Sequence, residues 1–424
     1  MLNRREFLSR SLKGASLLAV GSVVPQFIAN TARAAEAGKD TILVVIEMTG
    51  GNDGLNTVIP YTDELYYKYR PTLGVKKEQA VRVTDEIGLN PALRSFDQLL
   101  QRGELAIVQG VGYPNPDRSH FESMDIWQSA DPKRKTPSGW IGRSVPDLQD
   151  KNGNVPVVQL GADKLPLALQ GTPSGVVSIN NRTPYRLELA GGSKEQQGAR
   201  RKLIEELAQT SDKDQGDLLQ FVQRRQLQTY ATLEKLQELL KRQNVQGFIP
   251  EGIDFEVNGR GMGFGNLFTK LQLVAAMIQQ EFGTRVFYVA IDGFDTHSNQ
   301  AETHRRLFEE LSNAVTFLFN QLRGTGHDKR TLVMTFSEFG RRVQENGSRG
   351  TDHGSGSCLF VAGPGVKAGP VGKHPSLSEL DQGDLKYHTD FRRVYATLLD
   401  GWLKCDSRHV LGDKFEHLDL LKKA

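Results

Sequence analysis

The sequence predicts an α/β protein with a central, mostly parallel β-sheet and helices on both faces. Short apolar runs rich in β-branched residues, typical of buried strands, alternate with longer amphipathic segments along most of the chain. Such alternation favours parallel strands joined by crossover helices. Charged residues make up 24% and apolar residues 38% of the sequence, which are ordinary values for a folded protein. The 424 residues suffice for one large domain or two smaller ones.

Residues 1–34 are expected to be a cleavable export signal that takes no part in this fold. Arg4 and Arg5 form a twin-arginine pattern ahead of a weakly apolar segment, residues 15–29, and an Ala-x-Ala cleavage pattern follows at residues 32–34. The alternative is a membrane anchor, but a glycine and a proline interrupt the apolar segment, which is short for a membrane span. We therefore expect the twin-arginine translocation (Tat) machinery to export the chain to the periplasm or beyond, with no stable membrane span after cleavage.

Charge and cysteine content argue against two kinds of site. The chain has a formal net charge of +3, and residues 1–34 hold five basic side chains and one acidic one, which leaves −1 for the remainder. A remainder without excess positive charge lacks the electrostatic footprint of a nucleic-acid-binding protein. Cys358 and Cys405 are the only cysteines, too few for a cysteine-based zinc cage. They are predicted to be buried free thiols, although an oxidising compartment would also allow them to pair.

The mature fold is predicted to begin with a buried strand at residues 40–46, followed by a glycine-rich turn at residues 49–56. Asp53 in this turn is the first candidate metal ligand, and the alternative is a simple Asn-Asp-Gly turn. A helix at residues 91–102 and a second strand at residues 105–108 follow. The first strand thus leads into a carboxylate at its expected carboxyl end.

The second strand opens into a turn that ends in Ser119 and His120, directly before a predicted helix at residues 121–128. Ser119 has two interpretations of equal weight. As a helix cap, its hydroxyl would accept a hydrogen bond from a backbone amide of the first helical turn. As a nucleophile, it would lie beside the other strand ends, where amides at the start of the helix help to bind an anion. The neighbouring His120 imidazole is the alternative functional group at this turn.

The middle of the chain is predicted to be peripheral. Residues 131–196 are rich in glycine and proline with short apolar runs, and we expect peripheral strands and loops there. Residues 197–250 are largely rich in glutamate, lysine, glutamine and leucine at roughly helical spacing, and they are expected to form a helical insertion. This insertion would pack on the same domain, cover the site or bind a partner.

The rest of the chain resumes the alternation of helix and strand. Helices are expected at residues 266–280 and 300–323, strands at residues 285–291, 331–336 and 358–361, and a closing amphipathic helix at residues 389–404. The last two strands are separated by a loop rich in asparagine, glycine and serine. Acidic residues and histidines follow each strand of this part except the last.

Six side chains near the expected strand ends are candidate metal ligands: Asp53, Asp295, His297, Glu338, Asp352 and His353. We expect them to lie together, because ligands bind at the carboxyl ends of the strands in open α/β sheets. Mixed carboxylate and imidazole ligands suit Zn, Mn or a similar divalent ion. Two such ions roughly 4 Å apart would clamp a phosphoryl or sulfuryl oxygen and activate an attacking hydroxyl. The alternative is that these residues are scattered caps and turns.

Five ordered motifs resemble those of the bacterial family called domain of unknown function 1501. They are Gly50-Gly51-Asn52-Asp53-Gly54-Leu55-Asn56, Ser119-His120-Phe121, Phe294-Asp295-Thr296-His297, Ser337-Glu338-Phe339-Gly340-Arg341 and Gly350-Thr351-Asp352-His353-Gly354. The resemblance covers essentially all of the mature chain, residues 35–424. It implies Tat export and an alkaline phosphatase-like fold, in the superfamily of alkaline phosphatases and sulfatases, whose members are mostly two-metal hydrolases and mutases.

The resemblance also implies which residues bind the two ions. Asp352 and His353 resemble the paired Asp-His ligands that the superfamily has at a strand end. Asp295 and His297 resemble the ligands of the other ion, although a single residue separates them where the superfamily more often has three. Asp292 is the alternative carboxylate, but its spacing to His297 does not match either. Both ions would therefore be held by loops that follow strands.

Further roles follow from the same resemblance. Asp53 resembles the first-strand carboxylate, and Ser119 lies where a nucleophilic serine or threonine is expected, with His120 as the alternative functional residue. Glu338 would be a ligand or would orient a ligand. Arg341 would bind the oxyanion of the substrate, although it needs no such role if it is a surface charge.

The leading hypothesis is an exported metal-dependent hydrolase of phosphate or sulfate esters, with an anionic ester as its substrate. The rival hypothesis is a non-catalytic exported protein that keeps the fold and a metal and acts as a binding partner, because a shared fold does not establish an activity. The predicted nucleophile separates the two hypotheses, since a hydrolase would lose turnover when Ser119 is replaced by alanine.

Overall fold

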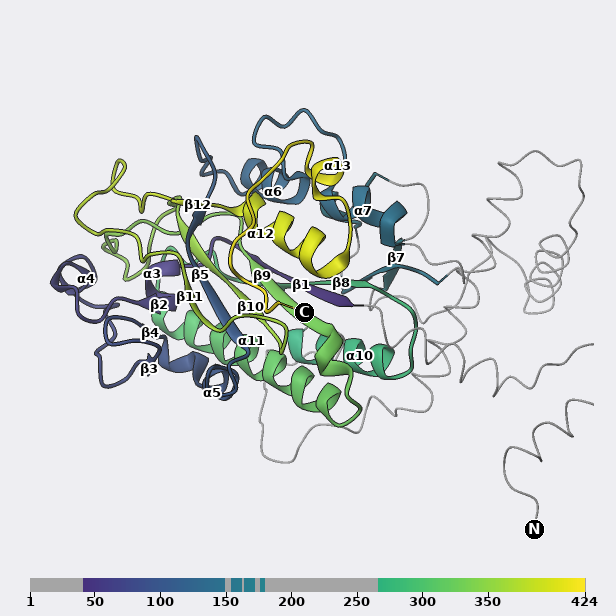
Figure 1. Cartoon of the computed structure of the whole chain (residues 1–424). Coiled ribbons are helices and arrows are strands. Elements are labelled where there is room, and N and C mark those ends of the chain that lie inside the picture. Colours follow the sequence, from purple (N-terminus) through teal and green to yellow (C-terminus); the bar gives the residue numbers. More distant parts are fainter. Residues whose placement is uncertain (1–40, 149–153, 162–163, 172–175, 180–265, 424) are drawn as a thin grey trace, which may run out of the picture. The chain divides into compact units, whose positions relative to one another are not determined.

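The computed structural model describes residues 41–148, 154–161, 164–171, 176–179 and 266–423 (Figure 1). The predicted export signal (residues 1–34) and the predicted helical insertion (residues 197–250) lie outside the described residues. Within the described ranges, no helix is both long enough and apolar enough to span a membrane.

A sheet of nine strands forms the centre of the described part of the chain (Figure 1). In spatial order its strands are β11 (Gly369–Val371), β5 (Leu105–Gly112), β10 (Ser357–Ala362), β9 (Thr331–Phe336), β1 (Ile42–Thr49), β8 (Val286–Asp292), β6 (Val157–Leu160) and β7 (Val176–Ile179), and β12 (Thr389–Asp390) pairs with β5. Every pairing is parallel except those of β10, which runs antiparallel to both neighbours. The predicted central, mostly parallel sheet is therefore confirmed.

The first strand of the chain lies in the middle of this sheet. β1 is buried along residues 42–48 and pairs with β8 on one side and β9 on the other. In this register Thr49 lies beside Asp292, and Glu47 lies beside Phe336. The three strands end at nearly the same level, so the loops that follow them start at one edge of the sheet. The antiparallel direction of β10 returns the long loop after β9 to that same edge.

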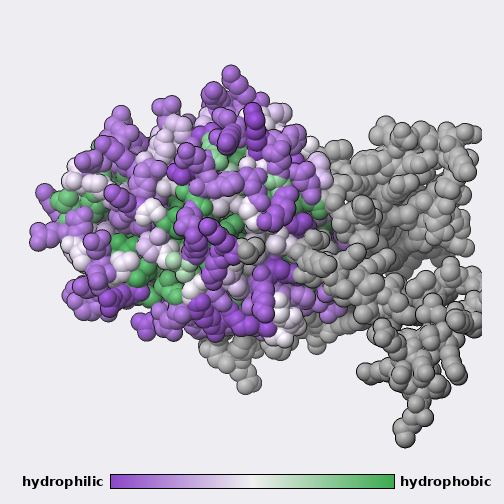
Figure 2. Space-filling view, in the orientation of Figure 1, coloured by the Kyte–Doolittle hydropathy of each residue, from purple (hydrophilic) through white to green (hydrophobic). Residues whose placement is uncertain are grey.

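Helices cover both faces of the sheet (Figure 1). One face carries η1 (Pro91–Phe96), α5 (Asp97–Gln101), α10 (Leu267–Gln279) and α11 (Gln300–Arg323), and the other carries α6 (His120–Ser129), α7 (Trp140–Leu148), α12 (Phe391–Leu398) and α13 (Ser407–Leu411). Side chains along β1 alternate between two cores, since Val44 and Ile46 pack on the first face and Leu43 and Val45 on the second. Hydrophilic residues predominate on the outer face shown in Figure 2, with hydrophobic ones in small patches.

Short elements complete the described chain. α3 (Gly54–Thr57) and α4 (Glu64–Tyr69) follow β1, and β2 (Val58–Ile59), β4 (Gly88–Leu89) and β3 (Val81–Arg82) form a separate antiparallel sheet. η2 (Leu167–Leu169) and η3 (His327–Arg330) are 3-10 helices, and η4 (Leu399–Leu403) is a π-helix. The antiparallel sheet and α4 lie next to α3, which begins within the glycine-rich turn of residues 49–56.

The structure adds detail to two sequence predictions. The strands expected at the periphery within residues 131–196 include β6 and β7, which form one edge of the central sheet beside β8. Their apolar runs are too short to reveal pairing with a strand that is distant in the sequence. The helix expected at residues 91–102 consists of η1 and α5. The thiols of Cys358 and Cys405 are free, as predicted, and burial raises the pKa of each to about 12.

Candidate metal centre

The loops at the carboxyl edge of the sheet bring three potential metal ligands together. His120 is the first residue of α6, Asp295 follows β8, and His353 lies in the loop between β9 and β10. One nitrogen or carboxylate oxygen from each of them lies within 4.8 Å of the other two. No second group of this kind occurs among the described residues.

His297 approaches the same group. Its Nε2 is 2.9 Å from His353 Nε2 and 3.0 Å from an Asp295 oxygen, and His353 Nε2 is 3.2 Å from that oxygen. His120 Nε2 is 3.4 Å from the other Asp295 oxygen. Three imidazole nitrogens and one carboxylate therefore crowd together at distances that are typical of ligands around a metal ion.

Hydrogen-bond acceptors fix the Nδ1 atoms of two of these histidines, His120 and His353. His120 Nδ1 donates to Glu338 Oε1 at 2.8 Å, and His353 Nδ1 donates to the backbone carbonyl of Arg118 at 2.7 Å. Glu338 is held in turn, because the same oxygen accepts the Gly50 amide at 2.8 Å. A neutral histidine with its proton on Nδ1 presents a lone pair at Nε2. Both imidazoles therefore face the group with a potential ligand atom.

The residues present fit a divalent metal ion. His120 Nε2 is buried and makes no hydrogen bond, since its 3.4 Å contact with Asp295 is only an ion-pair distance. A buried polar atom without a partner costs free energy, and a bound cation would satisfy its lone pair. Imidazole nitrogens with a carboxylate suit Zn, Mn or a similar ion, whereas Ca and Mg favour all-oxygen sites.

Neighbouring groups set the ionisation of these ligands. Burial raises the pKa of Asp295, but the hydrogen bond and charge of Arg341 lower it to about 2. The hydrogen bond and charge of Glu338 raise the pKa of His120, against the effect of burial. Asp295 is therefore ionised at neutral pH, the form that binds a cation. At acidic pH a proton competes with a metal ion for His120.

Asp352, another predicted ligand, lies beside the group. Its Oδ1 is 3.2 Å from His297 Nδ1 and accepts a bond from the Asn346 side-chain amide at 3.2 Å. The bond from Asn346 lowers the pKa of Asp352. The structure thus brings Asp352 and His297 next to Asp295 and His353, and Glu338 contacts the group through His120 rather than directly.

Asp53, also predicted as a ligand, lies elsewhere. It is fully buried and forms an ion pair of 2.5 Å with Arg70, whose guanidinium also contacts the second carboxylate oxygen at 3.1 Å. The Gln300 side-chain amide donates to Asp53 at 2.5 Å. The Asp53 carboxylate also caps α3 by accepting a hydrogen bond from the Asn56 backbone amide. These bonds account for the whole carboxylate without a metal ion. The turn interpretation of this segment describes the contacts of Asp53 better than the ligand interpretation.

Arg341 is buried rather than a surface charge. Its guanidinium donates to the backbone carbonyls of Gly50, Gly51, Phe294 and Thr351, and it pairs with Asp295 at 2.7 Å. All three of its nitrogens are engaged in these bonds. We therefore assign Arg341 to holding three loops of the site together, and the contact with a substrate oxyanion stays a prediction.

Ser119 lies immediately before the first ligand candidate. It is the N-cap residue of α6 and is half-buried, but its side chain does not make the capping hydrogen bond. No hydrogen bond joins its hydroxyl to another described residue, whereas its backbone amide donates to Asp117 at 2.7 Å. The hydroxyl therefore does not cap the helix, and the nucleophilic role of Ser119 stays a prediction.

The sequence does not predict the ligand role of His120 or the pairing of Arg70 with Asp53. His120 is expected at the site as a catalytic alternative to Ser119, whereas the geometry places it among the ligand candidates. Its place at a strand-to-helix turn, like the Asp and His residues after other strands, was the available signal. Arg70 carries no signal, because nothing local marks the partner of a buried carboxylate.

The described part of the chain is therefore an α/β protein, and its candidate metal centre lies at the carboxyl ends of the central strands. The sequence matches the family described as "Protein of unknown function (DUF1501)" across residues 40–412, and the chain belongs to that family. The resemblance that the five motifs indicate is thereby confirmed.

No curated protein matches the sequence. Among solved structures, Ps i-CgsB is similar with 11% identity and a TM-score of 0.36, over 89% of this chain and 73% of that one. The PsFucS1 sulfatase from Pseudoalteromonas sp. has 11% identity and a TM-score of 0.33, over 92% and 72%. Alkaline phosphatase from the Antarctic bacterium TAB5 has 13% identity and a TM-score of 0.31, over 77% and 93%. No activity follows from likeness at this level.

Proposed function

We propose that this chain is an exported metal-dependent hydrolase of phosphate or sulfate esters. The observation that carries the proposal is the convergence of His120, Asp295 and His353, with ligand atoms within 4.8 Å of one another. These residues, with His297 beside them, would hold a divalent ion such as Zn or Mn. When bound, such an ion supplies Lewis-acid polarisation of an ester oxygen.

The residues around the centre have complementary roles in this proposal. Ser119 Oγ would attack the phosphorus or sulfur atom of the ester beside the backbone amides at the start of α6, and the bond to the alcohol would break. The departing alcohol oxygen would take up the Ser119 proton, and water would then release phosphate or sulfate and restore the Ser119 hydroxyl. Glu338 would keep His120 Nε2 directed at the ion through the bond to Nδ1. Arg341 would keep Asp295 ionised and in place. A second ion would lie against His297 and Asp352, which contact each other beside the first group.

The first test is the metal content of the purified chain, measured by elemental analysis. We expect about one to two equivalents of Zn, Mn or a similar ion. The double variant His120→Ala/His353→Ala should lose this metal, while His409→Ala, which removes an exposed histidine, should keep it. A folded chain that takes up neither Zn nor Mn when they are supplied contradicts the proposal.

The second test is turnover of p-nitrophenyl phosphate and p-nitrophenyl sulfate by the metal-loaded chain. Ser119→Ala should reduce turnover of the accepted ester by at least about a thousandfold while fold and metal content stay unchanged. Metal binding without turnover of either ester would instead favour a non-catalytic metal-binding protein.

A further inference from the structure

Two arginine side chains beside the candidate metal centre share one buried carboxylate. Arg118 donates to Asp384 Oδ2 from Nε at 3.0 Å and from Nη2 at 2.7 Å. Arg342 Nε lies 3.9 Å from the other oxygen of the same carboxylate, Oδ1. Asp384 itself therefore shows that a single anionic group can lie within reach of both guanidinium groups.

This arginine pair, Arg118 and Arg342, keeps free donors and an uncompensated positive charge. Each arginine side chain is 38% exposed, whereas Asp384 is 2% exposed. No other carboxylate of the described residues forms an ion pair with either arginine. Arg118 Nη1 and all the side-chain nitrogens of Arg342 make no hydrogen bond within the described part of the chain, since 3.9 Å is only an ion-pair distance. Exposed guanidinium donors of this kind favour carboxylate, phosphate or sulfate oxygens.

The backbone of the arginine pair adjoins the candidate metal centre. Arg118 directly precedes Ser119, and its carbonyl accepts the bond from His353 Nδ1 at 2.7 Å. The Arg342 amide donates to the Asp352 carbonyl at 3.0 Å. Neither guanidinium has a hydrogen bond or ion pair with the side chain of a candidate ligand in the described ranges. The arginine pair thus lies beside the centre, and an anionic group bound there is a different one from an ester group held at the ligands.

We propose that the arginine pair binds a second anionic group of the substrate, carried by the alcohol part of the ester that reacts at the metal centre. The substrate class is then phosphate or sulfate esters whose alcohol bears a further carboxylate, phosphate or sulfate group. This substrate class rests on the proposed hydrolase function, whereas anion binding by the arginine pair does not. Two measurements therefore test the two parts separately.

The first measurement is a calorimetric titration of the full chain with inorganic phosphate, after a chelator has removed metal ions and has itself been dialysed away. We expect a dissociation constant of about 10 mM or lower. Arg118→Gln and Arg342→Gln should each weaken binding at least about tenfold, because each removes charge-assisted contacts to the anion. Arg342→Gln leaves the bonds between Arg118 and Asp384 in place, so it tests the site even if Arg118→Gln does not fold. His353→Ala should keep phosphate binding, which excludes protonated histidines of the metal centre as the binding site.

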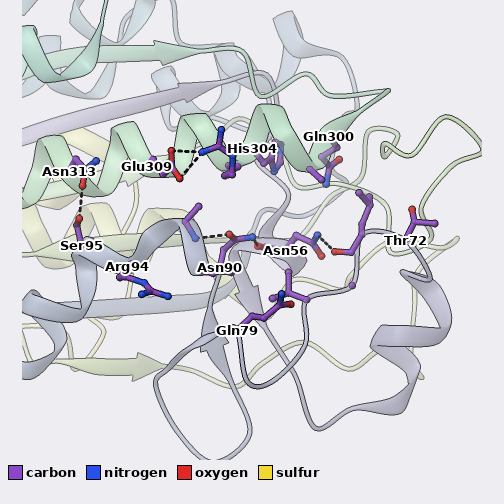
Figure 3. Close-up of a pocket in the computed structure, with 17 residues that line it drawn as sticks. Asn56, Thr72, Gln79, Asn90, Arg94, Ser95, Gln300, His304, Glu309 and Asn313 are labelled. Carbon is purple, nitrogen blue, oxygen red and sulfur yellow. Dashed lines mark hydrogen bonds and ion pairs between the residues drawn. The ribbon is translucent and has the colours of Figure 1, made fainter. Parts of the chain in front are cut away.

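Arg94 provides the matched control for the loss of an arginine charge. It is exposed, and its guanidinium has no hydrogen bond or ion pair with another described residue. It lines a groove of about 660 Å³ between the first half of α11 and the segments around η1, and neither Arg118 nor Arg342 lines this groove (Figure 3). Arg94→Gln should therefore leave phosphate binding unchanged. Binding that is lost in Arg94→Gln but kept in Arg342→Gln would assign the anion to the groove and overturn the proposal.

The second measurement compares two esters in the metal-loaded chain. They are the phenyl and the 4-carboxyphenyl ester of whichever acid, phosphoric or sulfuric, the chain hydrolyses, and they differ in one negative charge on the alcohol. We expect kcat/KM to be at least about tenfold higher for the 4-carboxyphenyl ester. Arg342→Gln should abolish this preference, whereas Arg94→Gln should keep it.

Each measurement has an outcome that contradicts its part of the proposal. Absence of phosphate binding by the metal-free chain, or equal binding by the Arg118→Gln and Arg342→Gln variants, would overturn the anion site. Equal kcat/KM for the two esters, or an equal loss of both in Arg342→Gln, would overturn the role in binding a second anionic group. Turnover of neither ester contradicts the hydrolase function and with it the substrate class, and the phosphate titration then still decides whether the arginine pair binds an anion.

Discussion

At the scale of single residues, Glu338 determines how His120 faces the candidate metal centre. Its carboxylate is buried and accepts bonds from the Gly50 amide, the Ser337 hydroxyl and His120 Nδ1. The bond to Nδ1 fixes the tautomer that leaves Nε2 free for a cation. The same bond raises the pKa of His120. Glu338 therefore influences the centre without lying in it.

Replacing Glu338 with glutamine should weaken the site while leaving every proposed ligand in place. We expect the affinity for Zn to fall about 10- to 100-fold, as is typical when the partner of a ligand histidine is lost. The pKa of His120 in the metal-free protein should fall as well, because the negative charge that stabilises the imidazolium is removed. Zn titration and NMR of the imidazole measure the two effects. Glu345→Gln is the matched control, and equal behaviour of both variants would contradict this role.

The contacts of Asp53 lead to a different prediction. Burial raises its pKa, but the charge and hydrogen bonds of Arg70 outweigh burial and lower it. Asp53→Asn would leave the Arg70 charge buried without its partner and should lower the free energy of unfolding by about 3–5 kcal/mol in urea titrations. Metal content of the folded fraction should stay unchanged. Asp85→Asn, in the exposed pair with Arg82, should cost less than about 1 kcal/mol. Loss of metal in folded Asp53→Asn would restore the predicted ligand role.

At the scale of elements, the glycine turn after β1 allows the loop after β8 to approach closely. Gly50 has a φ of +117°, and a Cβ atom there would lie 2.4 Å from the Asp295 backbone nitrogen. Gly50→Ala should displace Asp295 and lower Zn affinity at least about tenfold in a metal titration. Gly103 has a φ of +67° with open space around it. Gly103→Ala should cost about 1–2 kcal/mol of backbone strain and leave Zn affinity unchanged, and equal Zn affinity of both variants would exclude the steric explanation.

Arg341 connects the loops of three elements. Arg341→Met would leave four buried backbone carbonyls without these donors, and we expect the free energy of unfolding to fall by more than about 3 kcal/mol in urea titrations. The neighbouring Arg342, which is partly exposed and lies 3.9 Å from Asp384, provides the control. Arg342→Met should cost about 1 kcal/mol or less. Similar losses in both variants would show that Arg341 does not have this structural role.

At the scale of the whole molecule, sheet topology assembles the site. β1 lies between β8 and β9 in one register, and β10 returns antiparallel, so the loop after β1, the loop after β8 and the loop between β9 and β10 meet at one edge. β5 and α6 then bring Ser119 and His120 to this edge from another part of the chain. The candidate centre is therefore a property of the folded sheet rather than of any one segment.

Export is a prediction that concerns the protein as a whole. The double variant Arg4→Lys/Arg5→Lys should stay in the cytoplasm, because the Tat machinery recognises the twin arginines themselves. The two lysines keep the positive charge, so a loss of export would not be a charge effect. Cell fractionation with an antibody against the chain measures the distribution. Arg10→Lys/Lys13→Arg is the matched control and should be exported normally. Unchanged export of the Arg4/Arg5 variant would remove the support for the Tat route.

By itself, the sequence determined the class of fold, the position of most central strands and helices, and the loops in which the candidate ligands lie. Apolar periodicity and glycine turns are local properties, and they can be read from neighbouring residues. These local patterns do not show that Asp53 and Asp295 differ in their ability to bind a metal ion, because both are aspartates in loops after strands. A buried arginine neutralises Asp53, whereas Asp295 faces three histidines.

Only the tertiary structure decided these differences in role. It placed His120 with His353, gave Arg341 its backbone partners and joined β6 and β7 to the central sheet. Each of these outcomes depends on distances between residues far apart in the chain. Charge, burial and hydrogen bonding then determine whether a given carboxylate or imidazole can bind a metal ion, and these properties exist only once the distant segments have packed together.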